Sequence, residues 1–341
     1  MITIHGDAVL SSVNVYGKGL RTKLDYYRKR ASLVEKFLFD HPDDWGRFQN
    51  EFNSIVNMYF TEVANFARNN TEKAVDKLRT NFVKNYRDLF IRGDLNARSL
   101  TKPYGYAGDF EIIDDIYLNQ PKTNGFDRLF DNYFQMSSVC NAVRNRKEDF
   151  KRIIIDFINT NYWRKLRILD LASGPCRELL EMGLNPHVKK ENIEIDCLDH
   201  DPRSLLYAKR LLEETPLKVD FKVQNALKLC TERSVQKILP HKYDLIYSTG
   251  LFDYLSDRTT ISLIASLYSC LNPGGVLVVS DVRDKGSNPS AYYMEWVGEW
   301  ELTYKEDGEL FDCFVSAGIE KKKLNIQYEQ QGIFQYILAK R

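Results

Sequence analysis

Residues 165–177 read KLRILDLASGPCR, and they carry the clearest indication of the fold class. Its apolar run, residues 168–172, ends at Ser173-Gly174-Pro175, and an amphipathic segment, residues 176–182, follows at once. This pattern predicts a buried parallel strand, a tight turn and then a helix. Small residues in such a turn let the backbone approach a ligand, and the start of the helix turns N–H groups without helical partners toward it.

The chain after this turn repeats the alternation of strand and helix. Residues 194–198 predict a second strand that ends at Asp199, followed by His200, and residues 218–223 predict a third strand that ends before Asn225-Ala226. A carboxylate at the end of the second strand is placed to accept both hydroxyls of a ribose. The G-x-G-x-x-G pattern of nicotinamide-binding domains is absent, so the sequence favours a different nucleotide.

Further strands complete the predicted sheet. Residues 243–247 form the fourth strand, which exits into Thr249-Gly250-Leu251, and the turn Asn272-Pro273-Gly274-Gly275 leads from a helix into the fifth strand, residues 276–280. Proline stops the helix, and glycine supplies a positive φ. The chain finishes as two strands, residues 324–329 and 333–339.

The first hundred residues have a different pattern. Residues 1–18 show no clear hydrophobic period and predict an irregular or short-strand start. Within residues 20–92, apolar and aromatic residues recur at helical spacing. We interpret their aromatic residues as the core of a helical bundle. Next comes KPYGYAGDFEIIDDIY, residues 102–117, which predicts a loop followed by a helix from Phe110. A second helix is expected from Phe126 into residues 142–146.

Composition limits the partners and the compartment. Lysine and arginine nearly cancel aspartate and glutamate, leaving a net charge of +1, so no global field favours nucleic acid or an anionic membrane. The six cysteines form no CxxC pair, and no metal site is expected. We see no signal sequence and no apolar run of about 20 residues, which predicts a cytoplasmic protein with reduced thiols and no integral membrane association.

The strand ending in Asp170, with its small-x-Gly turn, resembles motif I of the class I S-adenosylmethionine (SAM)-dependent methyltransferases. Ala172 and Cys176 stand where that motif usually has two of its three glycines. The resemblance implies an α/β, Rossmann-like sheet of seven strands, the last one antiparallel, and SAM as cofactor. Asp199 would hold the ribose, and the Asn225 side-chain oxygen would accept from the adenine amino group. The implied cofactor-binding residues are Asp170, Ala172, Ser173, Gly174, Asp199, His200, Asn225, Ala226, Thr249, Gly250 and Leu251.

Three other stretches narrow the resemblance. GYAGD at 105–109, AVRNR at 142–146 and GLFDYL at 250–255 resemble signatures of the bacterial 3-hydroxypalmitic acid methyl ester synthase-like methyltransferases, and Asn288-Pro289 with MEW at 294–296 adds a fourth match. The resemblance runs from about Arg98 to the C-terminus. The first hundred residues lie outside the resemblance, and their helical pattern leads us to expect a helical domain and active-site lid over residues 1–140, ahead of a methyltransferase domain over 141–341.

The family activity implies a small-molecule carboxylate as methyl acceptor, such as that of a hydroxylated fatty acid. A carboxylate is already ionised at pH 7 and needs no base. Arg144 or Arg146 could grip it bidentately. Asp109, Asp253 and Glu295 could bind the SAM amino group or act as a base, and Tyr106 and Tyr254 could line the transfer channel. The catalytic candidates are Tyr106, Asp109, Arg144, Tyr254 and Glu295.

Two alternatives stay open. The first keeps the fold and transfers methyl to nitrogen, hydroxyl or carbon of another metabolite with a carboxylate as base. The second is a non-catalytic SAM-binding protein whose N-terminal helices bind a partner. The sequence leaves the oligomeric state open, with a homodimer as one option.

Overall fold

The computed structural model describes residues 4–230 and 232–341, and the side chains of residues 19–230 and 235–341. The chain divides into two compact units, each with its own internal packing. Unit 1 comprises residues 1–108, 119–140 and 289–301, and unit 2 comprises residues 109–118, 141–288 and 302–341. Among the residues described, no helix has both the length and the apolar character needed to cross a membrane.

Unit 2 is built on one sheet, which among the described residues has seven strands in the order β3-β2-β1-β4-β5-β7-β6. Strands β1 to β5 pair in parallel, whereas β7 is antiparallel to both β5 and β6. This confirms the predicted sheet with an antiparallel last strand. The strands are β1 (Leu166–Leu171), β2 (Ile193–Asp199), β3 (Lys218–Val223), β4 (Tyr243–Ser248), β5 (Leu271–Val282), β6 (Leu324–Tyr328) and β7 (Phe334–Lys340).

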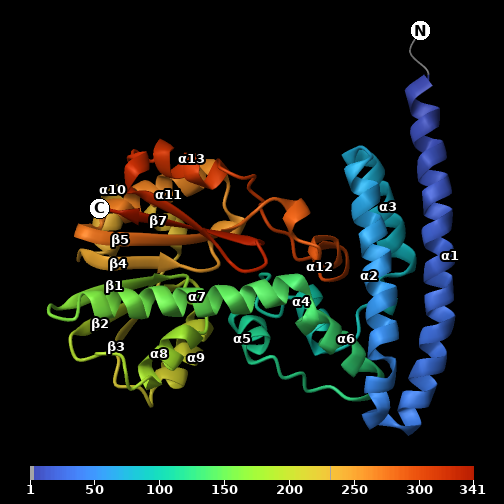
Figure 1. Cartoon of the computed structure of the whole chain (residues 1–341), viewed down its shortest axis with the longest axis horizontal. Helices are drawn as coiled ribbons and strands as arrows, with labels where there is room; N and C mark the ends of the chain where they lie inside the picture. Colours follow the sequence, from blue (N-terminus) through green and yellow to red (C-terminus); the bar gives the residue numbers. More distant parts are fainter. Residues whose placement is uncertain (1–3, 231) are drawn as a thin grey trace. The chain divides into compact units, whose positions relative to one another are not determined.

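Helices cover both faces of this sheet, so its central strands β1, β2 and β4 are buried along nearly their whole length and do not alternate between buried and exposed residues. Figure 1 shows α10, α11 and α13 on one face and α7, α8 and α9 on the other. The first face buries a contiguous apolar cluster that includes Leu169, Ile246, Leu263 and Phe314. The helices are α5 (Phe110–Leu118), α7 (Ser138–Thr160), α8 (Arg177–Leu184), α9 (Pro202–Leu212), α10 (Glu232–Ile238), α11 (Asp257–Ser269) and α13 (Glu309–Ser316).

Unit 1 is helical, and aromatic side chains fill its core as the sequence predicted. On α2, the buried residues Phe52, Val56, Tyr59 and Val63 recur every three or four positions, which places them on one face. The Trp296 ring centroid lies 5.6 Å from that of Phe82 within this core. The helices are α1 (Ile4–Asp40), α2 (Gly46–Arg68), α3 (Glu72–Asn85), α4 (Asp94–Thr101), α6 (Gly125–Met136) and α12 (Ala291–Val297).

The structure corrects three local predictions. Residues 4–18, expected to be irregular, continue α1, because no proline interrupts the chain before Pro42; residues 1–3 lie outside the described part. The helix expected from Phe126 through residue 146 breaks at Ser137, where α6 ends in an extended residue and α7 begins. Strand β5 starts at Leu271 and so contains the Asn272–Gly275 turn, with a register shift against β4 and a positive φ of 78° at Gly274.

Candidate active site

The predicted cofactor residues of unit 2 follow four neighbouring strands. The chain leaves β1 toward β2 and β3 on one side of the sheet and returns to β4 on the other. Such a reversal of strand order leaves a crevice outside the carboxyl ends of the strands, and this is where open α/β sheets bind ligands. The structure therefore brings together the β1 turn, the end of β2, the residues after β3 and the exit of β4, all at one edge of the sheet.

The turn after β1 has an unusual backbone. Ala172, Gly174 and Cys176 have φ values of 56°, 56° and 55°, all in the left-handed region. That region suits glycine, and a side chain there costs about 1–2 kcal/mol. Ala172 and Cys176 are the two residues that replace glycines of the motif, so the backbone keeps the glycine conformation at both positions.

Asp199 holds the turn in place. Its Oδ2 accepts a 3.0 Å hydrogen bond from the Gly174 N–H, and its Oδ1 accepts a 2.9 Å bond from the Asp201 N–H. The His200 ring Nδ1 lies 3.2 Å from Oδ1, and this contact raises the pKa of His200. Each carboxylate oxygen can accept more than one hydrogen bond, so Asp199 keeps capacity for ribose hydroxyls. Ser204 Oγ also donates to the Gly174 carbonyl at 2.9 Å.

Two carboxyl groups are buried beneath the turn. Asp170, at the end of β1, is 1% exposed; burial and the charge of Glu178 raise its pKa well above the usual range. Burial likewise raises the pKa of Glu178, on α8, to about 6. Glu178 Oε1 accepts a 3.1 Å bond from the Tyr247 hydroxyl on β4. Asp170 is therefore a support below the turn and is screened from solvent.

The residues after β3 and β4 complete this edge. Asn225 is exposed, and its Oδ1 accepts a 2.8 Å bond from the Leu227 N–H, which caps the short helix η3 (Ala226–Leu229). One lone pair of that oxygen is left for an adenine amino group. Thr249, Gly250 and Leu251 are half-buried and follow β4 directly. Ser248, the last residue of β4, ties that strand to β1 through a 2.8 Å bond from its Oγ to the Leu171 carbonyl.

A cluster of four buried charges lies just past β4 and β5. Arg146 on α7 donates from Nη1 to Asp253 Oδ2 at 2.9 Å, and its guanidinium lies 4.0 Å from the Phe334 ring centroid. Lys305 Nζ lies 2.8 Å from Asp281 Oδ2 at the end of β5. Burial, together with the charge of Asp253, raises the pKa of Asp281 to about 8.

Four atoms of this cluster have no hydrogen-bond partner among the described residues: Arg146 Nε, Asp253 Oδ1 and both carboxylate oxygens of Asp281, of which Oδ2 has Lys305 as its ion-pair partner. A β-carbon added at Gly250 would lie 3.4 Å from Arg146 Nη2, so the cluster adjoins the predicted cofactor residues.

The catalytic candidates are spread over both units. In unit 2, Arg144 donates to the Ile116 carbonyl at 3.1 Å and to Asn141, so its guanidinium already holds the end of α5. Asp109 accepts from the Glu111 and Ile112 N–H groups and caps the start of α5. Tyr254, in η4 (Phe252–Tyr254), is exposed. Tyr106 and Glu295 belong to unit 1, where Glu295 is buried on α12.

Sequence reasoning missed the contacts of Asp114. This buried residue on α5 pairs with both Nε and Nη2 of Arg177, the first residue of α8, and accepts from the Tyr207 hydroxyl on α9 at 2.5 Å. The partners are 63 and 93 residues away in the chain. Local pattern carries no signal at such a separation; the one available hint was a charged residue on the apolar face of a predicted helix.

The residues of this edge fit an adenosyl cofactor. Ser173 Oγ is buried in the turn and has no hydrogen-bond partner among the described residues, so a polar group of a ligand can satisfy it. Asp199, which accepts from the Gly174 N–H of the same turn, offers oxygens for hydroxyl groups.

Comparison with known proteins agrees with this geometry. Residues 169–277 match a family described as "Methyltransferase domain". A solved structure of a possible exported protein from Bordetella parapertussis superposes with a TM-score of 0.55 at 18% identity over 96% of each chain.

Two further solved structures are more distant, and no curated protein matches the chain. A putative O-methyltransferase from Nostoc punctiforme PCC 73102 has 16% identity over 57% of this chain and 56% of its own, with a TM-score of 0.43. Magnesium protoporphyrin IX methyltransferase from Synechocystis PCC 6803, with bound S-adenosylhomocysteine (SAH), has 11% identity over 73% of this chain and 100% of its own, with a TM-score of 0.48. From the family match and the strand-end site, the chain is an enzyme with a class I methyltransferase domain that uses SAM as its cofactor.

Proposed function

We propose that this enzyme transfers the methyl group of SAM to the carboxylate of a small molecule, and that hydroxylated fatty acids are the acceptor class to test first. The observation that carries the proposal is the buried guanidinium of Arg146. Its Nη1 is paired with Asp253, whereas its Nε has no hydrogen-bond partner among the described residues. A buried N–H of this kind costs free energy until an acceptor reaches it, and a ligand carboxylate is such an acceptor.

The second half of the same ion pair supports a hydroxylated acceptor. Asp253 Oδ1 is buried and lacks a hydrogen-bond partner among the residues described. It can accept from a ligand hydroxyl, while Arg146 Nε donates to the ligand carboxylate. Because the Arg146–Asp253 pair is neutral as a whole, it presents one donor and one acceptor without a net charge to solvate.

Bound SAM supplies a methyl group on a positively charged sulfur. In the proposed reaction a carboxylate oxygen forms a bond to that methyl carbon, the carbon–sulfur bond breaks, and its electron pair stays on sulfur. No proton moves, because the acceptor is already ionised. The protein's part is then to align the acceptor, hold its carboxylate through Arg146 and keep out the water that would solvate it.

A second candidate function rests on Asp281. Its pKa of about 8 and its unpartnered Oδ1 are the properties of a general base that works near neutral pH. A base at this position suits a hydroxyl, amine or carbon acceptor, from which a proton must be removed. In that case Asp281 takes the proton and Arg146 orients the acceptor.

The pH dependence of the methyl-transfer rate separates the two candidates. Radiolabelled SAM would be incubated with hydroxylated fatty acids, and with their amide and alcohol analogues, between about pH 5.5 and pH 9.5. A carboxylate acceptor predicts a rate that is flat above about pH 6. Such a rate should survive Asp281→Asn but fall at least about 100-fold in Arg146→Met, which removes the guanidinium and keeps an apolar chain.

Transfer confined to the alcohol or another non-carboxylate acceptor would contradict the carboxylate proposal. A rate that rises toward pH 8 and disappears in Asp281→Asn would then support the base-assisted reaction.

A further inference from the structure

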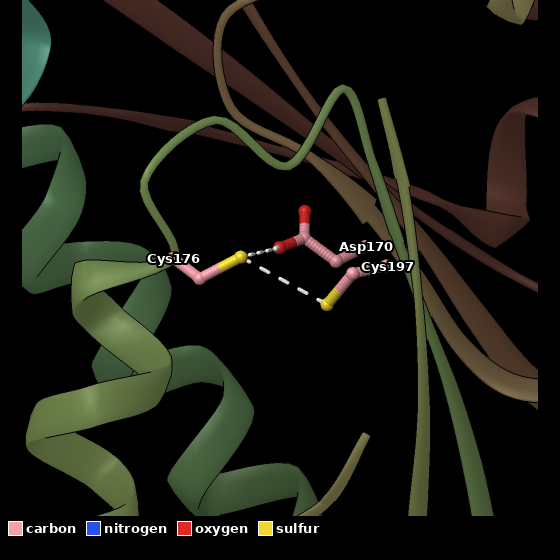
Figure 2. A group of neighbouring side chains, drawn as sticks. All are labelled: Asp170, Cys176 and Cys197. Carbon is pink, nitrogen blue, oxygen red and sulfur yellow. Dashed lines mark hydrogen bonds between the residues drawn. The ribbon is translucent and has the colours of Figure 1, made fainter. Parts of the chain in front are cut away.

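Three buried side chains converge below the turn between β1 and α8. Asp170 and Cys197 are directly paired in the parallel ladder of β1 and β2, so their side chains leave the sheet on the same face. Cys176, the residue before α8, points back toward them (Figure 2). Its Sγ lies 3.8 Å from Asp170 Oδ2 and 3.8 Å from Cys197 Sγ. All three ligand atoms lie within 4.8 Å of one another.

The residue at position 176 is itself unexpected. Its φ of 55° is one that glycine adopts freely and that a side chain makes strained. Cysteine at this position brings a thiol that is 0% exposed and faces a second thiol and a carboxylate. A glycine would remove the strain and also the thiol, so a use for the sulfur would account for the residue found here.

The spacing of the ligand atoms matches tetrahedral coordination. Two sulfurs bound at about 2.3 Å to one Zn²⁺ lie about 3.8 Å apart, and a sulfur and an oxygen bound at about 2.3 and about 2.0 Å lie about 3.5 Å apart. The observed distances from Cys176 Sγ are 3.8 Å to Cys197 Sγ and 3.8 Å to Asp170 Oδ2. The ligand atoms of Asp170 and Cys197 lie within 4.8 Å of each other, so they have to approach by no more than about 1.3 Å to reach the same geometry.

We propose that Asp170, Cys176 and Cys197 form a binding site for one thiophilic divalent cation of the zinc class. Two thiolates favour a soft or borderline metal, and the carboxylate favours a divalent ion such as Zn²⁺ over Cu⁺. Binding forms two sulfur–metal bonds and one oxygen–metal bond, and it releases to solvent the protons held by the two thiols and by the buried Asp170 carboxyl, without any change of oxidation state. Three protein ligands leave one tetrahedral position for water or another side chain.

The position of this site gives it a consequence for the SAM turn. Asp170 and Cys176 stand at the two ends of residues 171–175, so one ion bound to both would clamp the turn below its ligand-facing side. The inference concerns the turn itself and does not depend on which acceptor the enzyme methylates.

Cadmium is the probe for the test, because cadmium–thiolate bonds give an ultraviolet charge-transfer band. The reduced, metal-free full chain would be titrated with Cd²⁺ under argon, and Zn²⁺ would then be added to displace it. We expect one Cd²⁺ per chain, release of about two to three protons per ion from the two thiols and the Asp170 carboxyl, and loss of the band as Zn²⁺ competes.

The variants locate the site. Cys176→Gly removes one ligand at a position that already has a glycine backbone, so this variant should fold. Cys197→Val removes the other thiol. Each should weaken Cd²⁺ binding at least about 100-fold, because ligand loss should cost no less than the 10–100-fold effect of losing an outer-shell partner. The matched control is Cys230→Ser, a half-buried thiol outside the cluster, which should bind Cd²⁺ like the wild type.

Two results would overturn the proposal. One is a wild-type chain that takes up no stoichiometric Cd²⁺ at micromolar concentration. The other is Cys176→Gly binding Cd²⁺ with the band intensity and affinity of the wild type, which would place the ion at other thiols.

Discussion

Replacing Ala172 with glycine should make this protein more stable, although the same replacement destabilises most proteins. Ala172 has a φ of 56°, a conformation that costs an L-residue about 1–2 kcal/mol. Ala172→Gly relieves that cost in the folded state. It also raises the conformational entropy of the unfolded chain, which opposes folding by about 0.4–1 kcal/mol. The difference leaves a net gain in the free energy of unfolding of about 0.5–1 kcal/mol.

The matched control is Ala265→Gly. Ala265 is exposed in the interior of α11 in the same unit, where glycine costs about 1 kcal/mol relative to alanine. One chemical change should therefore shift stability in opposite directions at the two positions.

Differential scanning calorimetry measures both variants on the same transition. Ala265→Gly identifies the unfolding transition of unit 2 by lowering its midpoint, and Ala172→Gly should raise that midpoint by about 1–4 °C. A decrease of similar size in both variants would refute the strain argument, because it would mean that Ala172 occupies an ordinary backbone conformation.

Three further outcomes follow from the buried polar groups. Asp253→Ala should destabilise unit 2 by about 3–5 kcal/mol in urea unfolding, because it leaves the Arg146 guanidinium buried without its counter-charge; an effect below about 1 kcal/mol would contradict this. Asp281 has a folded-state pKa of about 8, above its unfolded value, so its contribution to stability is complete below about pH 4 and is lost as pH rises through 8. Asp281→Asn should flatten that part of the stability–pH curve. An unchanged slope would argue against a raised pKa for Asp281. Asp201→Ala removes the side chain that caps α9 by accepting from the Arg203 N–H at 2.9 Å, and should cost about 1 kcal/mol in thermal unfolding.

The sheet of unit 2 was predictable because its signals are local. Apolar runs bounded by turn residues define β1 to β5, and the carboxyl ends of parallel strands meet at one edge by geometry alone. The positions of Asp199 and Asn225 at that edge follow from the strand boundaries. The seven-stranded order among the described residues, with β7 antiparallel, agrees with the resemblance to class I methyltransferases.

The long-range side-chain contacts could not be predicted in the same way. Arg146 pairs with Asp253 across 107 residues of the chain. The properties of the charged cluster depend on its burial, which the sequence around each of its residues does not reveal. Arg144 was preferred as the carboxylate ligand, but its donors already bind the Ile116 carbonyl and Asn141. The side-chain cluster of Asp170, Cys176 and Cys197 also has no local sequence signal, since the two cysteines are 21 residues apart and the ladder pairing of β1 with β2 brings Cys197 beside Asp170.

The roles assigned to individual residues remain predictions, and so does the active-site lid proposed for the N-terminal helices. Tyr106 and Glu295 lie in unit 1, whereas the cofactor edge lies in unit 2. Substitution of these two residues will show whether either contributes to methyl transfer.

The most direct test of the account is calorimetric titration of the protein with SAH, with Asp199→Ala and Asp201→Ala measured alongside. Asp199→Ala should remove a charged carboxylate that accepts two hydrogen bonds from the ribose hydroxyls, each about 1.5–3 kcal/mol, and that accepts one from the Gly174 N–H. SAH should therefore bind the wild type and Asp201→Ala with affinities within about threefold of each other, and should bind Asp199→Ala at least about 100-fold more weakly. Equal SAH affinity in all three proteins, or no binding to the wild type, would contradict the cofactor site described at the strand ends.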